Sequence, residues 1–268
     1  MSHDLEVLRA LAVDAARAGA DVLRDRFRNA RTLIERKSSA TDMVTDADHA
    51  SEAAVIDVVT RARPDDAILG EESGARDGTS GLRWIIDPLD GTTNFLYGIA
   101  QFCVSVAVED GDGMVAGCVL DPIAGEEFAA ARGAGATLND VPIRVSDATD
   151  LSVALVATGF AYEADERRIE ALMLPVLLPA VRDIRRQGSA ALDLALVACG
   201  RVDAYYEVPS LPWDVAAGSL IVREAGGLTA PMASISAGGG GLIAATPGIL
   251  ADLVALIATA RDAAGLRA

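Results

Sequence analysis

The sequence predicts an α+β fold in which two halves of one domain pack as layers. Apolar residues recur at helical spacing near the N-terminus, and a hairpin signal at 110–113 separates two apolar strands. After about residue 150, helical and strand segments alternate. A meander followed by alternating elements indicates an N-terminal α+β half, about 1–148, and a C-terminal α/β half, about 149–268.

In the first half, a helix is expected from Leu5 to Phe27, because apolar residues recur there every three or four positions. Thr45 is expected to cap a second helix that ends near Arg63, with Asp48 three residues on, as in a capping box. The strands expected in this half cover 33–37, 43–44, 67–69, 84–86, 102–108, 114–120, 127–131 and 136–138.

In the second half, each strand is followed by a helix. The last helix is expected to start near Pro247, because proline is favoured at the first helical position. A small-residue helix should cover 215–222, and strands are expected over 153–157, 182–186, 203–207 and 242–245.

Composition limits the class of protein. Apolar residues make up 51% of the 268 residues and aromatic residues only 4%, so the core must consist of Ala, Val, Leu and Ile. No apolar run approaches the ~18 residues of a membrane span, and no signal-peptide pattern opens the chain. We therefore expect a cytoplasmic protein without a membrane anchor.

Cysteine and histidine are too few for several kinds of site. The three cysteines, Cys103, Cys118 and Cys199, are widely spaced in apolar stretches and are expected to be reduced core thiols. Only two histidines occur, which nearly excludes a histidine-based metal centre or catalytic triad.

The net charge of −16 bears on binding partners. A strongly acidic surface repels nucleic acid, so direct binding to DNA or RNA is not expected. It also repels a phosphate substrate unless bound cations reverse the local field.

The segment from Trp84 to Phe95 is the most informative in the chain. An apolar strand ends in Asp87-Pro88-Leu89-Asp90-Gly91-Thr92, and Pro88 predicts that the chain turns at Asp87. Clustered oxygens suit hard divalent cations, and the amides of a Gly-Thr turn suit a phosphate. The same residue types are also ordinary in turns, so this segment alone leaves both interpretations open.

Two other segments supply carboxylates. Glu71 and Glu72 follow the apolar strand 67–69, where a solvated acidic turn is the alternative. Asp214 stands where the N-cap of a helix is expected, so its alternative role is capping.

Together, these motifs resemble the inositol monophosphatase family of magnesium-dependent, lithium-sensitive phosphatases. Gly70-Glu71-Glu72-Ser73, Asp87 to Phe95 and Trp213-Asp214 occur in the order and at the distances typical of that family. Similar family segments are found at 42–48 and from Gly188 to Gly227. The resemblance covers about residues 5–255 and implies a five-layer αβαβα sandwich with its active site between the halves.

The resemblance also implies roles for individual residues. Two to three Mg²⁺ ions would be held by carboxylates and one carbonyl: Glu71, Asp87, the Leu89 carbonyl, Asp90 and Asp214. Thr92, hydrogen-bonded to Asp48, would accept the proton of the attacking water. Without the family, Thr92 is equally a turn hydroxyl and Asp48 a helix cap. The phosphate would meet the amides of Gly91 and Thr92, and the substrate hydroxyls would meet Asp90, the backbone at Ala190, and Glu207.

One stretch and one single residue depart from the family on the side of the site that would bind the substrate's alcohol. The stretch from Pro209 to Pro212 is apolar where some members carry polar residues, and Gly159 offers no side chain. Thr93-Asn94-Phe95 resembles the branch that hydrolyses inositol 1-phosphate. Fructose 1,6-bisphosphate and histidinol phosphate fit the same ligand set, whereas bisphosphonucleotide phosphatases more often carry Lys-Glu after the Gly-Thr.

Further expectations concern partners. Family members are commonly homodimers, and some relatives of another class bind the transcription machinery as regulators. Lys37 is the single lysine of the chain and lies in a polar loop near the Asp48 motif. We hypothesise that this loop closes over the metals and that Lys37 contacts the phosphate or a metal-bound water, although a solvated surface lysine is the equal alternative.

Overall fold

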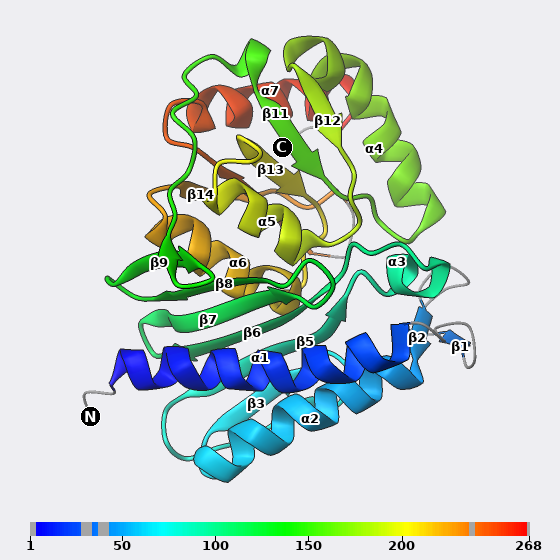
Figure 1. Ribbon diagram of the computed structural model, residues 1–268. Coiled ribbons are helices and arrows are strands. Elements are labelled where there is room, and N and C mark those ends of the chain that lie inside the picture. Colours follow the sequence, from blue (N-terminus) through cyan, green and yellow to red (C-terminus); the bar gives the residue numbers. More distant parts are fainter. Residues whose placement is uncertain (1–3, 28–33, 37–42, 236–238, 267–268) are drawn as a thin grey trace.

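The fold is a stack of five layers in which two sheets alternate with three pairs of helices (Figure 1). The computed structural model describes residues 4–27, 34–36, 43–235 and 239–266. The predicted α+β class and the αβαβα layering are confirmed. Lys37 lies outside the described residues, so its proposed contact stays a prediction.

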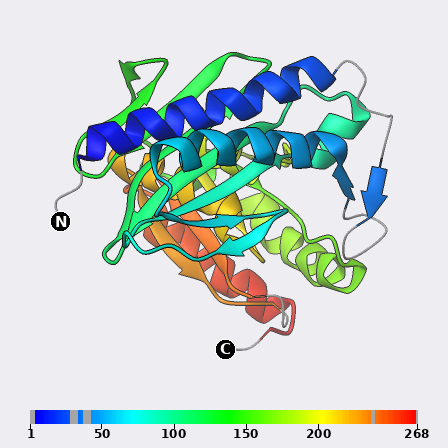
Figure 2. The ribbon, with the colours of Figure 1, turned by 90° about the horizontal axis from the view of Figure 1, so that it is seen from below.

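The outer layer of the first half consists of α1 (Leu5–Phe27) and α2 (Asp46–Ala62), which lie side by side on the large sheet (Figure 2). The predicted capping box is present: Thr45 is the N-cap of α2, and the Asp48 side chain accepts its backbone N–H. The two helices approach closely at Gly19, where an added Cβ would lie 2.7 Å from Ser51 Oγ.

The large sheet has eight strands in the order β10-β9-β8-β7-β6-β5-β3-β4. Neighbouring strands are antiparallel except β3 and β5, which are parallel. The strand bounds are β3 Ala67–Gly70, β4 Gly74–Arg76, β5 Arg83–Asp90, β6 Cys103–Asp110, β7 Gly113–Asp121, β8 Glu126–Ala131, β9 Gly135–Leu138 and β10 Val141–Pro142. Sequence patterns did not indicate β4 and β10, because both are short and exposed at the sheet edges.

Strand β5 is buried on both faces. Trp84 and Ile86 pack against the α1/α2 layer, whereas Ile85 between them packs toward the middle layer. The prediction that the chain turns at Asp87 is wrong. The strand continues to Asp90 through a β-bulge, since Asp87 pairs with Ser105 and Asp90 with Cys103, leaving one extra residue in β5. A bulge leaves a residue outside the ladder and therefore tolerates Pro88, which has no N–H to donate.

The middle layer consists of α5 (Ala190–Ala198) and α6 (Pro212–Glu224), which lie between the two sheets. Their small residues permit close packing: a Cβ on Gly218 would lie 2.6 Å from the Cβ of Leu194. A core with few aromatic residues therefore packs by close approach of its elements rather than by large side chains.

The second sheet has five strands in the order β12-β11-β13-β15-β14 and is mixed. Its outer face is covered by α4 (Ala164–Leu177) and α7 (Leu250–Ala263), which pack on each other. The final helix begins at Leu250 rather than near Pro247. The strand bounds are β11 Leu155–Thr158, β12 Asp183–Arg185, β13 Ala204–Glu207, β14 Leu228–Met232 and β15 Gly241–Ala245; the sequence analysis missed β14.

A small sheet and a short helix lie outside these five layers. Strands β1 (Ile34–Arg36) and β2 (Met43–Thr45) form a separate two-stranded sheet, and the short helix α3 (Thr92–Tyr97) follows β5. The three cysteines are free thiols; Cys103 and Cys118 lie in the core as expected, whereas Cys199 is half-buried. Within the described part of the chain, no helix combines the length and apolar character needed to cross a bilayer.

Candidate functional site

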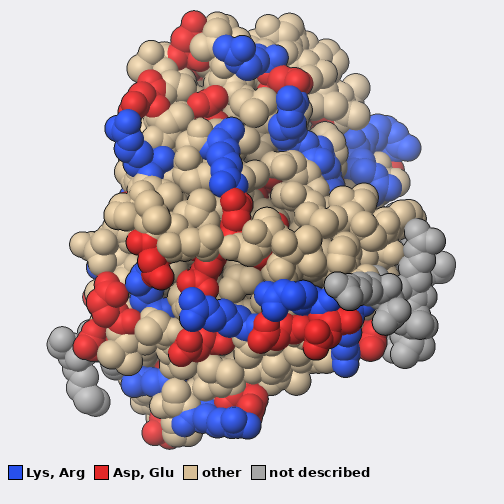
Figure 3. All heavy atoms as spheres, viewed as in Figure 1, with Lys and Arg blue, Asp and Glu red and all other residues tan. Residues whose placement is uncertain are grey.

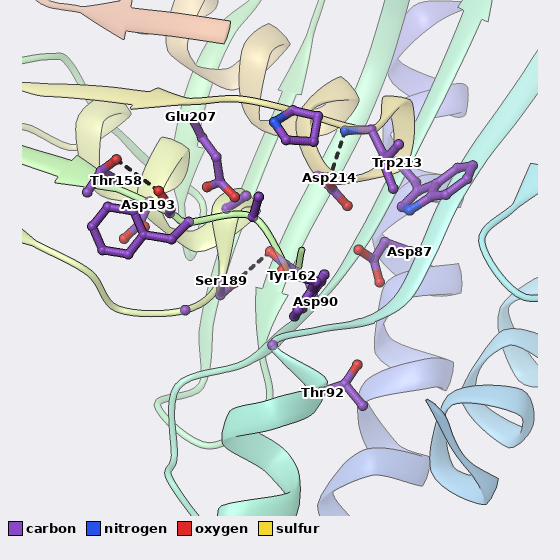
Figure 4. Close-up of a pocket in the computed structure, with 18 of the residues that line it drawn as sticks. Asp87, Asp90, Thr92, Thr158, Tyr162, Ser189, Asp193, Glu207, Trp213 and Asp214 are labelled. Carbon is purple, nitrogen blue, oxygen red and sulfur yellow. Dashed lines mark hydrogen bonds between the residues drawn. The ribbon is translucent and has the colours of Figure 1, made fainter. Parts of the chain in front are cut away.

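A cavity of about 310 Å³ opens between the two halves of the fold. Its lining comes from the ends of β3, β5 and β13, the β11–α4 and β12–α5 connections, and the starts of α3, α5 and α6. Figure 4 shows Asp87 and Asp214 on one side of this cavity and Glu207, Asp193 and Thr158 on the other. Apart from Asp48, which lies behind Thr92, and Lys37, which is not described, every predicted site residue lines it.

The bulge in β5 supplies two of the carboxylates. Asp87 is almost fully buried, and its Oδ1 accepts the N–H of Leu89 at 3.0 Å. The bulge is held from α2, where Ser51 Oγ donates to the carbonyl of Pro88 at 2.8 Å. The extra residue turns Asp90 toward the same cavity as Asp87, although the two are three positions apart.

Glu71 reaches the cavity from the end of β3. Its backbone N–H donates to the carbonyl of Ile86 at 3.1 Å, which sets it beside the Asp87 end of β5. The following amide, that of Glu72, is held by the Glu52 carboxylate of α2 at 3.0 Å. A parallel pair of strands thus brings together two acidic motifs that are separated in sequence.

Asp214 comes from the first turn of α6. It is not the N-cap as predicted but the third helical residue, and its Oδ2 accepts the N–H of Leu211 at 3.0 Å. Pro212 occupies the first helical position, one residue before Trp213. Because α6 runs between the sheets, its first turn points Asp214 at the two aspartates of β5 (Figure 4).

Mutual repulsion and burial perturb the titration of these carboxyl groups. Burial, followed by the charges of Glu71, Asp90 and Asp214, raises the pKa of Asp87 well above its ordinary value. Burial and the charge of Asp90 likewise raise the pKa of Asp214, and burial raises that of Asp90 to about 6. Carboxylates held together at this cost indicate a site for positive charge.

The donor set fits a hard divalent cation. Four carboxylates and a backbone carbonyl offer only oxygen. The thiol of Cys103 donates to Asp90 Oδ2 at 3.9 Å, and burial raises the pKa of this thiol. Trp213 Nε1, which also belongs to the lining, is the buried side-chain donor without a hydrogen-bond partner among the described residues. In the same described ranges, no three acidic, histidine or cysteine side chains lie close enough together to hold a metal ion in their present positions. The carboxylates line one cavity but do not form a complete coordination shell.

Ser189 holds Asp90 in place. As the N-cap of α5, its Oγ donates to Asp90 Oδ2 at 2.7 Å, and the amide of Ala191 donates to the same oxygen at 2.7 Å. These hydrogen bonds join the two halves at the wall of the cavity. Sequence reasoning assigned no role to Ser189, although its position before an apolar helix indicates an N-cap.

Thr92 and Asp48 form the predicted pair. Thr92 Oγ1 lies 3.1 Å from Asp48 Oδ1 and 3.1 Å from the Leu89 carbonyl. Asp48 is fully buried, and its other oxygen accepts the backbone N–H and the hydroxyl of Thr45. Burial raises the pKa of Asp48, while the Thr45 hydrogen bonds oppose that shift. Asp48 is therefore both a helix cap and a partner of Thr92.

The start of α3 lies beside this pair. Gly91 has a φ of 102°, a left-handed conformation that glycine adopts readily, and α3 begins at Thr92. This conformation brings the Gly91–Thr92 backbone to the cavity wall.

Glu207 lies at the end of the cavity away from Asp87. The hydroxyl of Tyr205 donates to its Oε2 at 3.0 Å, and burial raises the pKa of Glu207 to about 7. A Cβ on Gly159 would lie 2.1 Å from this carboxylate, so Glu207 occupies the space that a side chain at 159 would fill.

Asp193 is a cavity residue that sequence reasoning missed. It is buried, accepts from Gln187 Nε2 at 2.8 Å, and has a pKa raised well above normal by burial and by Glu207. A single carboxylate within the apolar run 190–198 was the available signal. Ala190, the predicted backbone contact, lines the cavity next to Ser189.

This fold, with carboxylates converging on a cavity between two sheets, is that of solved inositol monophosphatase structures. The model of the inositol monophosphatase family matches residues 4–263, and the chain belongs to this family.

Relatives and solved structures agree with this membership. Nus factor SuhB of Pasteurella multocida is 42% identical over 91% of this chain and 93% of its own length. Inositol-1-monophosphatase of Mycobacterium leprae is 44% identical over 84% of this chain and 81% of its own. Inositol monophosphatase from Anabaena superposes with a TM-score of 0.82 at 38% identity, covering 95% of this chain and 96% of the other.

Proposed function

We propose that this protein hydrolyses phosphate monoesters with Mg²⁺ and that myo-inositol 1-phosphate is its substrate. The observation that carries the proposal is the convergence of Glu71, Asp87, Asp90 and Asp214 from three segments on one cavity. Dependence on Mg²⁺ is general in this family. The same ligand set would serve fructose 1,6-bisphosphate or histidinol phosphate, which remain the alternative substrates.

In this proposal, Glu71, Asp87, the Leu89 carbonyl, Asp90 and Asp214 hold two to three Mg²⁺ ions. Bound Mg²⁺ stabilises charge on the phosphoryl oxygens and lowers the pKa of coordinated water. Trp213 Nε1 would find its missing acceptor in an oxygen bound at the same site.

The chain's own residues then orient the substrate and handle the proton. The amides of Gly91 and Thr92 bind the phosphate, while Asp90, the backbone at Ala190, and Glu207 bind the hydroxyls of the alcohol. The hydroxyl of Thr92 donates toward Asp48 and so presents a lone pair to the attacking water. Asp48 is buried and accepts from Thr45 and Thr92, which fixes the direction of this proton relay.

Replacing Thr92 with alanine tests the relay. Thr92→Ala should lower kcat by about 10²–10⁴, the usual contribution of a general base, while the Mg²⁺ concentration for half-maximal rate changes little. The neighbouring Thr93→Ala is the matched control and should retain the wild-type rate. Equal losses of metal affinity and rate would show that Thr92 only supports the turn.

A panel of phosphate-release assays tests the substrate. The panel compares inositol phosphates, fructose 1,6-bisphosphate, histidinol phosphate and a bisphosphonucleotide, each with Mg²⁺ and with Li⁺ added. We expect the highest kcat/KM with inositol 1-phosphate and inhibition by Li⁺ at millimolar or higher concentration. A higher kcat/KM for any other ester would transfer the assignment to that ester.

Regulatory binding is a second candidate, favoured by relatives named Nus factor SuhB that match most of this chain. The complete set of carboxylates argues against binding as the sole role. Acidic and basic side chains are interspersed on the face seen in Figure 3, and with a charge of −16 we propose that any such binding is to protein. Capture of RNA polymerase, measured beside phosphate release, separates the two roles.

Two further proposals concern the state of the protein in the cell. We propose a homodimer, which light scattering of the purified chain would test. We also propose a cytoplasmic location, which cell fractionation would test.

A further inference from the structure

The wall of the cavity near Glu207 is a single continuous segment, residues 158–162, which joins β11 to α4. It faces the end of the cavity that the proposed function assigns to the substrate's alcohol. Gly159 contacts the Glu207 carboxylate so closely that no side chain fits between them. A shift of this segment would therefore change the position of Glu207 and the shape of the alcohol site together.

The backbone amide of Ala161, in this wall, donates to a buried acid on the side away from the cavity. Glu170, on α4, is 6% exposed, and its carboxylate oxygens lie 3.0 and 3.3 Å from the backbone nitrogen of Ala161. The other residues around it, including Met173 and Met232, are largely apolar. The hydrogen-bond donor to this carboxylate is the neutral amide of Ala161, and Arg167 and Arg186 offset the cost of burial only in part. The overall fold alone therefore gives little reason for an acid at this position.

Two backbone carbonyls of the wall accept hydrogen bonds from a side chain of the same helix. Arg167 Nη1 donates to the carbonyls of Ala161 and Tyr162 at 3.1 and 2.6 Å. Both polar backbone groups of Ala161 are therefore bound by α4, one turn apart. Since α4 packs on α7 at the outer face of the small sheet, the wall is tied to a rigid layer.

We propose that Glu170 is a positioning residue: with Arg167 it fixes the 159–162 wall and so determines which alcohols the active site accepts. Glu170 does not touch the substrate and acts through Ala161. This inference rests on the proposed phosphatase function and adds to it the element that selects the alcohol.

The test compares Glu170→Leu, which removes the acceptor, with Glu170→Gln, which keeps one. Kinetics are measured with myo-inositol 1-phosphate, whose ring would reach the wall, and with methyl phosphate, whose alcohol would not. Asp165→Leu is the matched control, because Asp165 is an exposed acid on the same helix. Thermal unfolding of each variant establishes that it is folded.

We expect Glu170→Leu to raise KM for inositol 1-phosphate by about three- to tenfold, the effect of one lost hydrogen bond. This variant should differ from wild type by no more than about twofold in kcat, in Mg²⁺ dependence and in its kinetics with methyl phosphate, because only binding of the alcohol is affected. Both Glu170→Gln and Asp165→Leu should match wild type. If Glu170→Leu does not fold, Arg167→Leu replaces it, with the same rise in KM expected.

Three outcomes would overturn the proposal. An unchanged KM for inositol 1-phosphate, or equal losses with both esters, would reduce Glu170 to a structural residue while the phosphatase assignment stands. A wild-type enzyme that releases phosphate from neither ester would instead remove the proposed function and this inference with it.

Discussion

Asp214 illustrates how one carboxylate serves local structure and the site together. One oxygen accepts the N–H of Leu211 at the start of α6, while the side chain faces the aspartates of β5. Helix capping and metal binding were alternatives in the sequence. In the folded chain they are compatible, because a carboxylate has several lone pairs.

Replacing Asp214 with asparagine separates charge from hydrogen bonding. Asp214→Asn keeps an acceptor for Leu211 but removes one of four mutually repelling charges. We expect loss of phosphatase activity, with the melting temperature in chelator equal to or above that of wild type. Turnover near the wild-type value would contradict the assignment of Asp214 as a ligand.

Gly159 is a second residue whose role depends on its neighbour. A Cβ there would meet the end of the flexible Glu207 side chain rather than backbone, so an alanine displaces that carboxylate without breaking the fold.

Gly159→Ala should therefore raise KM for inositol 1-phosphate by about three- to tenfold, as expected for loss of one substrate hydrogen bond, and leave the melting temperature nearly unchanged. Steady-state kinetics and thermal unfolding measure the two effects. Glu207→Gln provides the comparison, since it alters the chemical group that would contact the substrate hydroxyl but leaves that group in place. A normal KM in Gly159→Ala would mean that the substrate does not reach Glu207.

At the scale of elements, the bulge in β5 determines where the carboxylates point. A regular strand would send Asp87 and Asp90 to opposite faces, because side chains alternate along a strand. The extra residue at Pro88–Leu89 cancels this alternation, and both carboxylates reach the cavity. The carbonyl of Leu89 is directed toward Thr92 by the same irregularity.

Helix α4 carries the element-scale prediction. Burial raises the pKa of Glu170 from its ordinary 4.5 to about 7, and the hydrogen bond from the Ala161 amide opposes that shift. The charges of Glu166, Arg167 and Arg186 add smaller effects of mixed sign. Tyr206 and Glu207 are the titratable groups that face it from β13. The folded protein binds this proton more tightly than the unfolded chain. Stability from this group is therefore fully present below pH 4.5 and is lost as the pH rises through 7.

Glu170→Gln removes this titration but keeps an acceptor for Ala161. We expect the melting temperature of the variant minus that of wild type to increase from pH 5 to pH 8. The increase should be ~2–4 °C for each kcal/mol by which the free energy of unfolding of the variant exceeds that of wild type. Asp165→Asn, on the exposed side of α4, should show no such trend. A constant difference across this pH range would mean that Glu170 titrates normally.

At the scale of the whole molecule, the site joins the two halves. Glu71, Asp87 and Asp90 come from the first sheet, whereas Asp214 comes from α6 in the second half. A cation bound by all of them would link the halves and stabilise the native state by mass action. The charge of −16 adds a general attraction for cations, which salt screens.

Magnesium should therefore raise the melting temperature of wild type in a saturable way and restore activity lost in chelator. NaCl at equal ionic strength controls for screening and should reproduce little of the shift. Asp214→Asn should show a much weaker response to Mg²⁺. Full activity in excess chelator would contradict the proposed metal dependence.

The sequence by itself determined the class of fold, most elements and the family. Hydrophobic periodicity is a local property, so α1, the β6–β7 hairpin and the Thr45–Asp48 capping box were all predictable. The acidic motifs were equally visible, because Glu71, Asp87 and Asp90 stand at or near strand ends in short recognisable strings. Short exposed strands such as β4 and β10 carry no such pattern and were missed.

The tertiary structure alone decided how these pieces meet. The bulge in β5 is a backbone irregularity, and the Ser189–Asp90 contact joins residues that are distant in sequence. The contact of Glu170 with the 159–162 wall is shorter in range, but it depends on how that segment packs against α4. The position of Asp193 in the cavity also follows only from the packing of α5 between the sheets. Periodicity reports which face of an element is buried, but it does not report what that face will contact, because long-range packing depends on the whole chain at once.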